Sequence, residues 1–559
     1  MRKSLILLAA LSACKPENNL TPEVYQDPNL VLEYPAAAEW APLGTVKARG
    51  IAEHLEQVKV NDAAASPEEG RFQADVDLKR GVNLVEASGI DMHGDPKFVR
   101  HGVLAGEFKE PQGAVAQAGR IRVNQGGIDA ILDTAAPMLD VYAVAPLISN
   151  PIYSDSYDIE IFGFGFELLQ VDAYLTQIWY DPPQLSADPT PGVLKVHGEL
   201  PNLYAQVYVT ADILGLWTIE PGTADVAASR IVMDLPLTVG APNHRLTVGM
   251  NTPTTRIDDF WFDLSLIPSE VEGWLLSDFV ESYLEDTVPG MLTDMLPGLV
   301  QSKLDALDPS FETELMGQPL AIDAAFSYAN VDDDGIILDV DLDVDMPGNG
   351  DLPYEGYLTG DAFGEEPDPS HASDLSMSLY DDLLNRVMFE VWSAGLLNLT
   401  LSSEDGSLSP LMLAPLHATE GTITMEGQLP PVVVKNADGE LEAQIGELMV
   451  TIDTPDGELG HHLVASITVF APLEVNVEND VLALALGTPV LTVTVRDSDW
   501  GAENETVTNL LEEMLPIDTM LRMFGDFTFP LPALPGISIA QGEATRDGDV
   551  HTNVTVDLQ

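Results

Sequence analysis

The clearest pattern in the chain is a strict alternation of apolar and acidic residues between Ile336 and Met346. The apolar members are Leu338, Val340, Leu342 and Val344, and an aspartate follows each of them. Because successive side chains of a β-strand point to opposite faces, this segment is predicted to be a strand with one buried and one solvated face. Shorter alternating segments recur along most of the chain between turns rich in Gly, Pro, Asn and Asp, which predicts long antiparallel sheets.

Apolar residues at helical spacing occur in a few segments, of which Pro268–Leu307 is the longest. Ser269 and Glu272 form a capping box, which satisfies backbone donors at a helix start. Pro289 and Pro297 are expected to break or kink the run. Its wide apolar stripe predicts a helix that covers a sheet, either as a plain lid or with an apolar slot beneath it. Shorter helices are predicted at 128–145, 380–394 and 506–524.

The order strand, helix, many strands and helix occurs twice, at 119–307 and at 315–559. In each segment two helices would cover a long, curved, antiparallel sheet. A period of roughly 200 residues is too long for a solenoid. The sequence therefore predicts an α+β protein with two related units, preceded at 28–108 by short strands and turns at the spacing of a β-sandwich.

The segment at 28–108 also resembles a known kind of module. Its pattern "VKVND…GRFQADVDLKRGVNLVEASGIDMHGD" is similar to the bacterial immunoglobulin-like modules of secreted proteins. The resemblance implies an Ig-like sandwich that acts as a spacer or adhesive module and carries no chemistry.

The chain is strongly acidic, with 24 Lys and Arg against 90 Asp and Glu and a formal net charge of −66. The segment up to Arg122 holds 14 of the basic and only 17 of the acidic residues, so nearly all the acidity lies in the two later units. Such a surface repels nucleic acid and anionic lipid headgroups. We therefore expect no nucleic-acid partner.

The chain has a single cysteine, Cys14, so it can form no intrachain disulfide. Cys14 is the last residue of the sequence Leu-Ser-Ala-Cys, which follows a basic start, Met1-Arg2-Lys3, and a short apolar core. This stretch is too short to span a membrane. It resembles a bacterial lipoprotein signal. The resemblance implies a signal peptide at 1–13, a lipid attached to Cys14, a tether at 14–27 and a place in the cell envelope, at the outer membrane or cell surface.

Two longer stretches resemble the bactericidal/permeability-increasing protein family, which belongs to the tubular lipid-binding (TULIP) superfamily. "LSMSLYDDLLNRVMFEVWSAGLLNLTL" (Leu375–Leu401) is similar to the start of that family's C-terminal barrel, and Val507–Leu558 to its C-terminus. "GRIRVNQGGIDAILDTAAP" (Gly119–Pro137) is similar to the opening of its N-terminal barrel. The resemblance implies two pseudo-symmetric barrels, each a long twisted sheet wrapped around a helix, with apolar pockets for the acyl chains of a lipid.

The expected pocket linings lie on the covering helices. They are Val271, Trp274, Leu275 and Phe279 in the first barrel, and Leu383, Val387 and Trp392 in the second. The family's antibacterial members bind lipopolysaccharide through a basic tip, and the corresponding region here offers only Lys195, Arg230, Arg245 and Arg256 among many acids. This departure, like the missing disulfide of the N-terminal barrel, argues against lipopolysaccharide binding. Carriage of acyl chains needs only the apolar slot.

No catalytic motif stands out: the chain lacks G-x-S-x-G, H-E-x-x-H and a phosphate-binding glycine loop. We expect no enzyme activity and no cofactor. The run from Asn330 loosely matches a calcium loop, with Asp332, Asp334 and Asp341 as candidate ligands. Its flanks are strands rather than helices, so a hairpin turn is the competing interpretation.

The sequence thus predicts a membrane-anchored lipoprotein that binds, and in one version transfers, lipids in apolar pockets. The alternative is a structural or adhesive surface protein whose barrels have filled cores and take no ligand.

Overall fold

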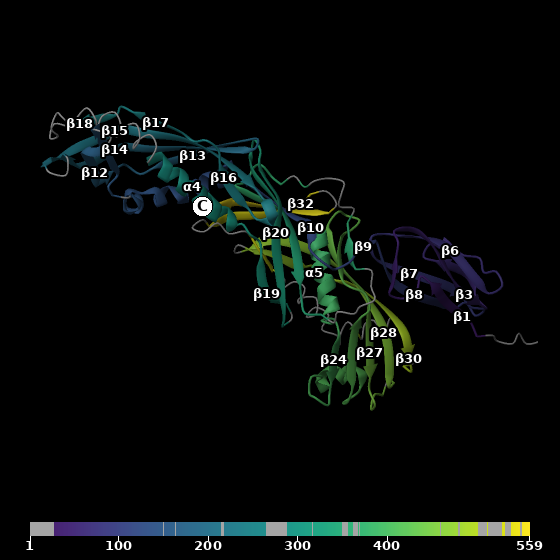
Figure 1. Ribbon diagram of the computed structural model, residues 1–559. Coiled ribbons are helices and arrows are strands. Elements are labelled where there is room, and N and C mark those ends of the chain that lie inside the picture. The colour runs from purple at the N-terminus through teal and green to yellow at the C-terminus, as the bar shows by residue number, and fades with distance from the viewer. Residues whose placement is uncertain are drawn as a thin grey trace, which may run out of the picture. The chain divides into compact units, whose positions relative to one another are not determined.

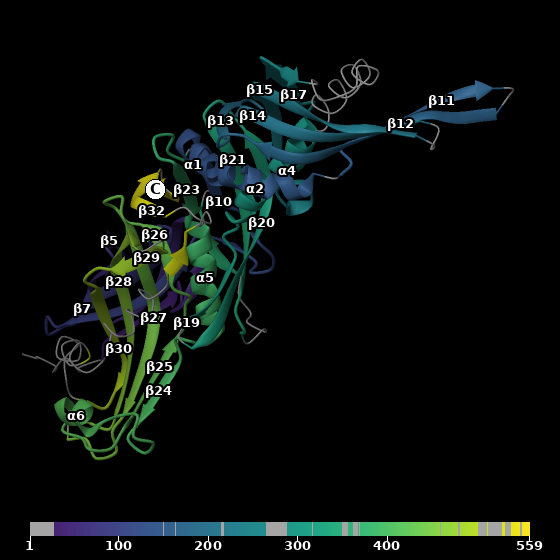
Figure 2. The same cartoon turned by 90° about the vertical axis from the view of Figure 1, so that its left-hand side faces the viewer.

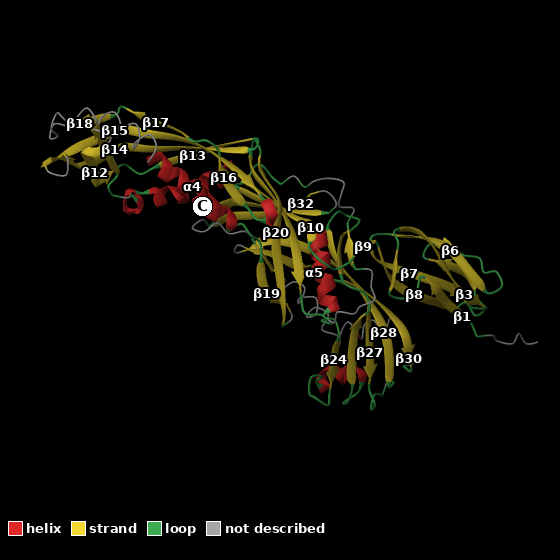
Figure 3. Cartoon of the chain, in the orientation of Figure 1, coloured by secondary structure: helices red, strands yellow, loops and turns green. Residues whose placement is uncertain are grey.

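The computed structural model describes residues 27–148, 150–161, 164–213, 217–263, 288–315, 317–348, 356–360, 367, 369–458, 460–478, 481–500, 511, 528–531, 538–547 and 550–558. Cys14, the predicted helix residues Val271, Trp274, Leu275 and Phe279, and nearly all of 506–524 lie outside the described residues. The chain divides into two compact units, Met1–Lys79 with Asn83–Val103, and Arg80–Val82 with Leu104–Gln559. Figure 1 shows its elements, and strands far outnumber helices among them (Figure 3).

The smaller unit consists of antiparallel sheets. One has the order β1 (Asn29–Tyr34), β3 (Gly44–Glu53), β6 (Arg71–Leu78). The other has the order β2 (Glu39–Ala41), β8 (Pro96–Ala105), β7 (Gly81–Ile90), β4 (Glu56–Val60), β5 (Ala63–Ala64). Burial alternates along β3 as the sequence predicts, with Val46, Ala48 and Ala52 facing inward. The immunoglobulin-like assignment of this module stays a prediction.

A seven-stranded antiparallel sheet forms the middle of the larger unit. Its order is β19 (Phe311–Leu315), β20 (Gln318–Val331), β21 (Gly335–Asp345), β10 (Val115–Asn124), β23 (Leu375–Tyr380), β33 (His551–Leu558), β32 (Ile539–Asp547). The alternating strand of the sequence is β21, and its four apolar members are each at most 2% exposed. β10 lies between β21 and β23, so this sheet draws strands from both of the predicted barrel segments.

Long, twisted sheets extend from either side of this middle sheet (Figure 2). The first contains β11 (Tyr153–Ile161), β12 (Phe164–Trp179), β13 (Gln184–Thr190), β14 (Val193–Ile213), β15 (Trp217–Gly240), β16 (Thr247–Met250), β17 (Thr254–Asp258) and β18 (Trp261–Asp263). The second contains β24 (Leu399–Ser402), β25 (Thr422–Gly427), β26 (Val432–Lys435), β27 (Leu441–Asp453), β28 (His462–Glu478), β29 (Val481–Leu486), β30 (Val490–Ser498) and β31 (Thr528–Pro530). A separate short ribbon pairs β22 (Tyr357–Thr359) with β9 (Glu107–Lys109).

The predicted helix at 128–145 is divided in the structure. α1 (Gln125–Ala135) is followed by the 3-10 turn η1 (Ala136–Leu139), then by α2 (Val141–Val144) and η2 (Ala145–Leu147). Pro137 opens the 3-10 turn, and the Asp140 carboxylate accepts a hydrogen bond from the Tyr142 N–H at 2.8 Å and so caps a new helix. The prediction of one continuous helix is therefore wrong.

α4 (Val288–Asp305) continues through Pro297, so the break predicted there does not occur. Pro289 lies in the first turn, where its missing N–H would have no intrahelical partner in any case. Leu296, Val300 and Leu304 are nearly fully buried, and this packing offsets the hydrogen bond that Pro297 removes.

α5 (Asp381–Ser393) confirms the helix predicted at 380–394. It ends where Gly395 adopts a φ of +74° and donates its N–H to the Trp392 carbonyl oxygen at 2.9 Å. A short helix α6 (Pro410–Leu413) and the turns η3 (Pro242–His244) and η5 (Ala414–Leu416) complete the described helical elements. None of the described helices combines the length and hydropathy needed to cross a bilayer.

Candidate functional site

α5 is the helix around which an apolar site is built. Asp381 and Asp382 lie in its first turn, where their negative charges interact favourably with the positive end of the helix dipole. Leu383, Val387 and Val391 follow at helical spacing and are at most 2% exposed. The helix packs against β10, β21, β22, β23 and β26, so it is enclosed on several sides.

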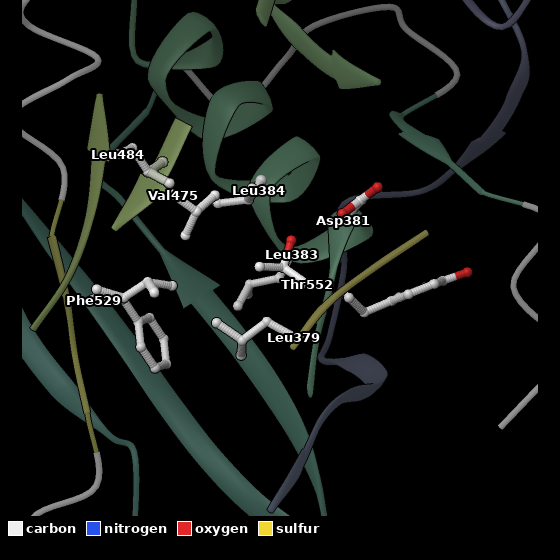
Figure 4. A pocket seen from close by; sticks show the side chains of 10 residues that line it. Leu379, Asp381, Leu383, Leu384, Val475, Leu484, Phe529 and Thr552 are labelled. Atoms are coloured by element: carbon white, nitrogen blue, oxygen red, sulfur yellow. The ribbon is translucent and has the colours of Figure 1, made fainter. Parts of the chain in front are cut away.

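An apolar pocket lies where the first turns of α5 meet β28, β29 and β31. Figure 4 shows the side chains of Leu379, Leu383, Leu384, Val475, Leu484 and Phe529 around one space. The remaining lining residues are Tyr380, Asp381, Leu482 and Thr552. The volume of the pocket is about 20 Å³, which is room for about one water-sized sphere. Its walls are almost entirely carbon.

A second apolar pocket lies further along α5. It is lined by Met388, Pro431, Val432, Val433, Ala443, Ile445, Leu473, Leu484 and Leu486. Its volume is also about 20 Å³. Leu484 lines both pockets, so they are neighbours beside the same helix. The Asn385 side chain, 1% exposed, fixes α5 to β26 by accepting a hydrogen bond from the Val433 N–H at 2.7 Å.

A buried ion pair borders the first pocket. Both carboxylate oxygens of Asp381 accept hydrogen bonds from Arg546, at 2.7 and 2.9 Å, and the same guanidinium donates to the Thr552 hydroxyl at 3.0 Å. Asp381 is 1% exposed. A bidentate pair of this kind compensates the loss of water around both charges. The Asp381 carboxylate therefore has its partner in Arg546 and not in the pocket.

The buried charge of Asp382 is less well compensated than that of Asp381. Its carboxylate accepts a hydrogen bond from the Gly360 N–H at 2.6 Å and lies 3.5 Å from Arg80. Burial, reinforced by the neighbouring charge of Asp381, raises the pKa of Asp382 to about 7, against the opposing effects of Gly360, Arg80 and Lys109.

The lining residues predicted on this helix are all on α5, but they have different surroundings. Leu383 lines the first pocket. Val387 is fully buried and lines neither pocket. The Trp392 indole N–H donates to the Gly427 carbonyl oxygen at 2.7 Å, and the centroids of the Trp392 and Phe389 rings are 5.6 Å apart. Trp392 therefore attaches the C-terminal end of α5 to β25.

The sheet side of the site was not predicted from the sequence. Val475, Leu482 and Leu484 come from alternating strands that the sequence does predict, and Phe529 comes from β31, within the sequence Phe-Pro-Leu-Pro after the last predicted helix. Each segment signals a buried face, but the packing of these segments against α5 joins residues far apart in the chain.

Asp332 and Asp334, two of the three candidate calcium ligands, lie in a hairpin turn. β20 ends at Val331 and β21 begins at Gly335, and Asp332 accepts hydrogen bonds from the N–H groups of Asp334 and Gly335, each at 2.9 Å. The second carboxylate oxygen of Asp332 pairs with Arg122 at 2.6 Å, and Asp341 accepts from the Gln117 N–H. The structure thus separates Asp341 from the turn. No group of three or more potential metal ligands occurs among the described residues.

Comparisons with known proteins give likenesses among solved structures only. No family model matches the chain, and no curated protein matches it. Among solved structures, "Crystal structure of lipopolysaccharide binding protein" matches at 16% identity, with a TM-score of 0.45, over 80% of this chain and 99% of that one. The chain is similar to that protein in this measure, but the likeness is too weak to assign a fold family or a function.

Proposed function

We propose that the chain binds the acyl chains of a lipid in the apolar space between α5 and the strands β28 and β29. Support comes from one observation, the two adjoining pockets that share Leu484 and have nearly all-carbon walls. Each methylene moved from water into such a space contributes about 0.8 kcal/mol. Asp381 and Arg546 satisfy one another, so this ion pair demands no polar partner from the ligand.

Binding requires the lining side chains to move. Two spaces of about 20 Å³ each are far below the roughly 300 Å³ at which ordinary ligand pockets begin. The lining side chains include Leu384 in the first pocket, the flexible Met388 in the second and Leu484 in both. We infer that a ligand displaces these side chains and takes over their contacts.

The same small volumes favour a second candidate function. If the interior beside α5 is a filled core, the larger unit is a structural or adhesive module without a ligand. A close-packed core of this kind is what ordinary protein interiors show. The two candidates differ in whether the chain carries a lipid when it is isolated.

Native mass spectrometry after gentle purification tests the proposal, with a bound mass in the lipid range as the expected result. The matched variants are Leu484→Phe, which adds volume at the residue shared by both pockets, and Leu320→Phe, at a residue 1% exposed in β20. Overpacking costs about 1–3 kcal/mol at either position. We expect only Leu484→Phe to reduce lipid loading. Lipid-free protein in all three samples would favour the filled core.

We also propose that the chain is an envelope lipoprotein anchored through Cys14. The proposal is supported by the basic start, the short apolar core and Leu-Ser-Ala-Cys in the sequence. Metabolic labelling with an alkyne-bearing fatty acid should mark the wild-type chain and fail to mark Cys14→Ser. Equal labelling of the two proteins would contradict the anchor.

A further inference from the structure

The start of α5 carries two adjacent buried carboxylates with unequal partners. Asp381 is 1% exposed and Asp382 is 5% exposed. Asp381 has the bidentate pair with Arg546. Asp382 has one short hydrogen bond, from the Gly360 N–H, and one long hydrogen bond of 3.5 Å, from the Arg80 guanidinium. The charge of Asp382 is therefore removed from water with incomplete compensation.

The surroundings of Asp382 leave little room for water. A Cβ added to Gly360 would lie 2.9 Å from Val550 and 3.0 Å from the Arg80 guanidinium, so the backbone, Arg80 and Val550 are in close packing at this point. The charged groups that act on Asp382 are Arg80, Asp381 and Lys109 of β9. On β22 the phenol of Tyr357 responds to the charges of Asp382 and Arg386.

β22 covers the same part of α5. Tyr357 and Leu358 are 2% and 1% exposed, and the Arg386 guanidinium lies over the Tyr357 ring at 5.8 Å. Among the described strands, β22 is paired with β9 alone, as a two-stranded ribbon. The hydrogen bond from Gly360 to Asp382 therefore joins the end of this small ribbon to the first turn of α5. Leu383 and Leu384, the next residues of that turn, line the first apolar pocket.

We propose that Asp382 acts as a pH-dependent latch on the apolar pocket. With a neutral Asp382 side chain, β22 and the first turn of α5 stay packed together. With an ionised side chain they separate more readily, and the side of the pocket formed by Leu383 and Leu384 opens. The latch itself depends only on the fold, whereas its role in ligand exchange rests on the proposed function above.

The direction of the effect follows from linkage. The packed state holds the proton with a pKa of about 7, and in an opened, hydrated state an aspartate has its ordinary value of about 4. Protons therefore stabilise the packed state. The opening equilibrium should rise about tenfold per pH unit between these two values and become constant above the higher one.

Hydrogen exchange of the ligand-free full-length chain tests the latch. We expect the amides of 356–360 and 381–388 to lose protection about tenfold per unit between pH 5 and pH 7, after correction for intrinsic exchange rates. Asp382→Asn keeps an acceptor for Gly360 and cannot ionise, so its protection should not vary with pH. Asp456→Asn, at an exposed turn whose carboxylate accepts from the Thr419 and Glu420 N–H groups, is the control and should keep the wild-type slope in 356–360 and 381–388. If protection in the wild type did not change with pH, the proposal would be overturned, whatever the variants showed.

Ligand exchange tests the second part. A neutral fluorescent acylglycerol is loaded onto the full-length chain, and its release is followed from pH 5 to pH 8, since this probe does not titrate itself. We expect release to accelerate at least tenfold in the wild type and to stay constant in Asp382→Asn. Failure of the probe to bind, with the exchange slope intact, would reject the proposed function and keep the latch. Binding with pH-independent release and a flat exchange profile would reject the latch alone.

Discussion

At the scale of single residues, the buried charges at the start of α5 determine much of the local energetics. Asp381 and Arg546 are 165 positions apart in the chain and form a bidentate pair beside the first pocket. A pair of this kind contributes little net stability compared with two well-packed apolar residues, but removal of one partner leaves a buried charge alone. This asymmetry leads to a double-mutant prediction.

Arg546→Met should lower the free energy of unfolding by about 3–5 kcal/mol, because it leaves the carboxylate of Asp381 buried and unpaired. Asp381→Leu combined with Arg546→Met should recover most of that loss, since no isolated charge remains. Urea denaturation of the wild type, both single variants and the double variant gives the coupling between the two positions. Additive losses would show that the pair is not coupled in this way.

Asp382 should make overall stability depend on pH in the direction opposite to a salt-bridged carboxylate. Its pKa in the folded chain is raised to about 7, so the folded state binds the proton more tightly than the unfolded state, in which Asp has its ordinary value near 4. The favourable contribution is complete below pH 4, declines as the pH rises and is gone above pH 7. Asp382→Asn should therefore stabilise the chain at pH 8, by up to about 4 kcal/mol for a shift of about three units.

The measurement is urea unfolding of both proteins at pH 5 and pH 8. The stability difference between variant and wild type should be larger at pH 8, where the wild-type side chain is ionised. An equal stability difference at pH 5 and pH 8 would mean that the Asp382 carboxyl does not titrate in this range.

At the scale of elements, local patterns predict strands well and helix boundaries less well. The alternation at 336–346 is confirmed as β21, because a period of two specifies a strand wherever one face is buried. The division of the helix at 128–145 depends on Pro137 and on the Asp140 cap, both of which are visible in the sequence. Continuity of α4 through Pro297 depends on tertiary packing of Leu296, Val300 and Leu304, which no local pattern contains.

The candidate site could be predicted on one side only. The helix and its residue Leu383 follow from apolar spacing, whereas Val475, Leu484 and Phe529 lie far from α5 in the chain and reach the same pocket through tertiary packing. The residues predicted on the covering helix of the first barrel, including Trp274, lie outside the described residues, so their role stays a prediction.

Two glycines offer a matched test of these elements. A Cβ on Gly335 would lie 2.1 Å from the Val123 carbonyl oxygen, so Gly335→Ala should force β10 and β21 apart and destabilise the chain by at least about 1–3 kcal/mol. Gly298 is an exposed residue inside α4 with nothing near its missing Cβ. Gly298→Ala should stabilise the chain by about 0.5–1 kcal/mol through helix propensity. Thermal unfolding of both variants should show shifts of opposite sign, and equal shifts would contradict the packing described at Gly335.

At the scale of the whole molecule, the middle sheet joins the two predicted barrel segments through β10. This strand has β21 on one side and β23 on the other, with Arg120 opposite Asp339 and Ser378. Arg120 also donates to both carboxylate oxygens of Asp339, at 2.6 and 3.0 Å. Arg122, 2% exposed, pairs with Asp332 in the β20–β21 turn. Each of the two fragments on either side of residue 308 would lack all of these contacts when it is produced by itself.

We therefore expect that neither the fragment ending at Leu307 nor the fragment starting at Asp308 folds cooperatively by itself. The first would leave β10 without either neighbour, and the second would expose the facing edges of β21 and β23, which are prone to pair with other chains. Near-ultraviolet circular dichroism and urea unfolding of each fragment provide the measurement. The control is the full-length chain with a protease site inserted after Asp308, an exposed residue, and its two pieces should stay associated after cleavage. If the second fragment unfolded at the same urea concentration as the intact chain, β10 could not be the strand that unites the two segments.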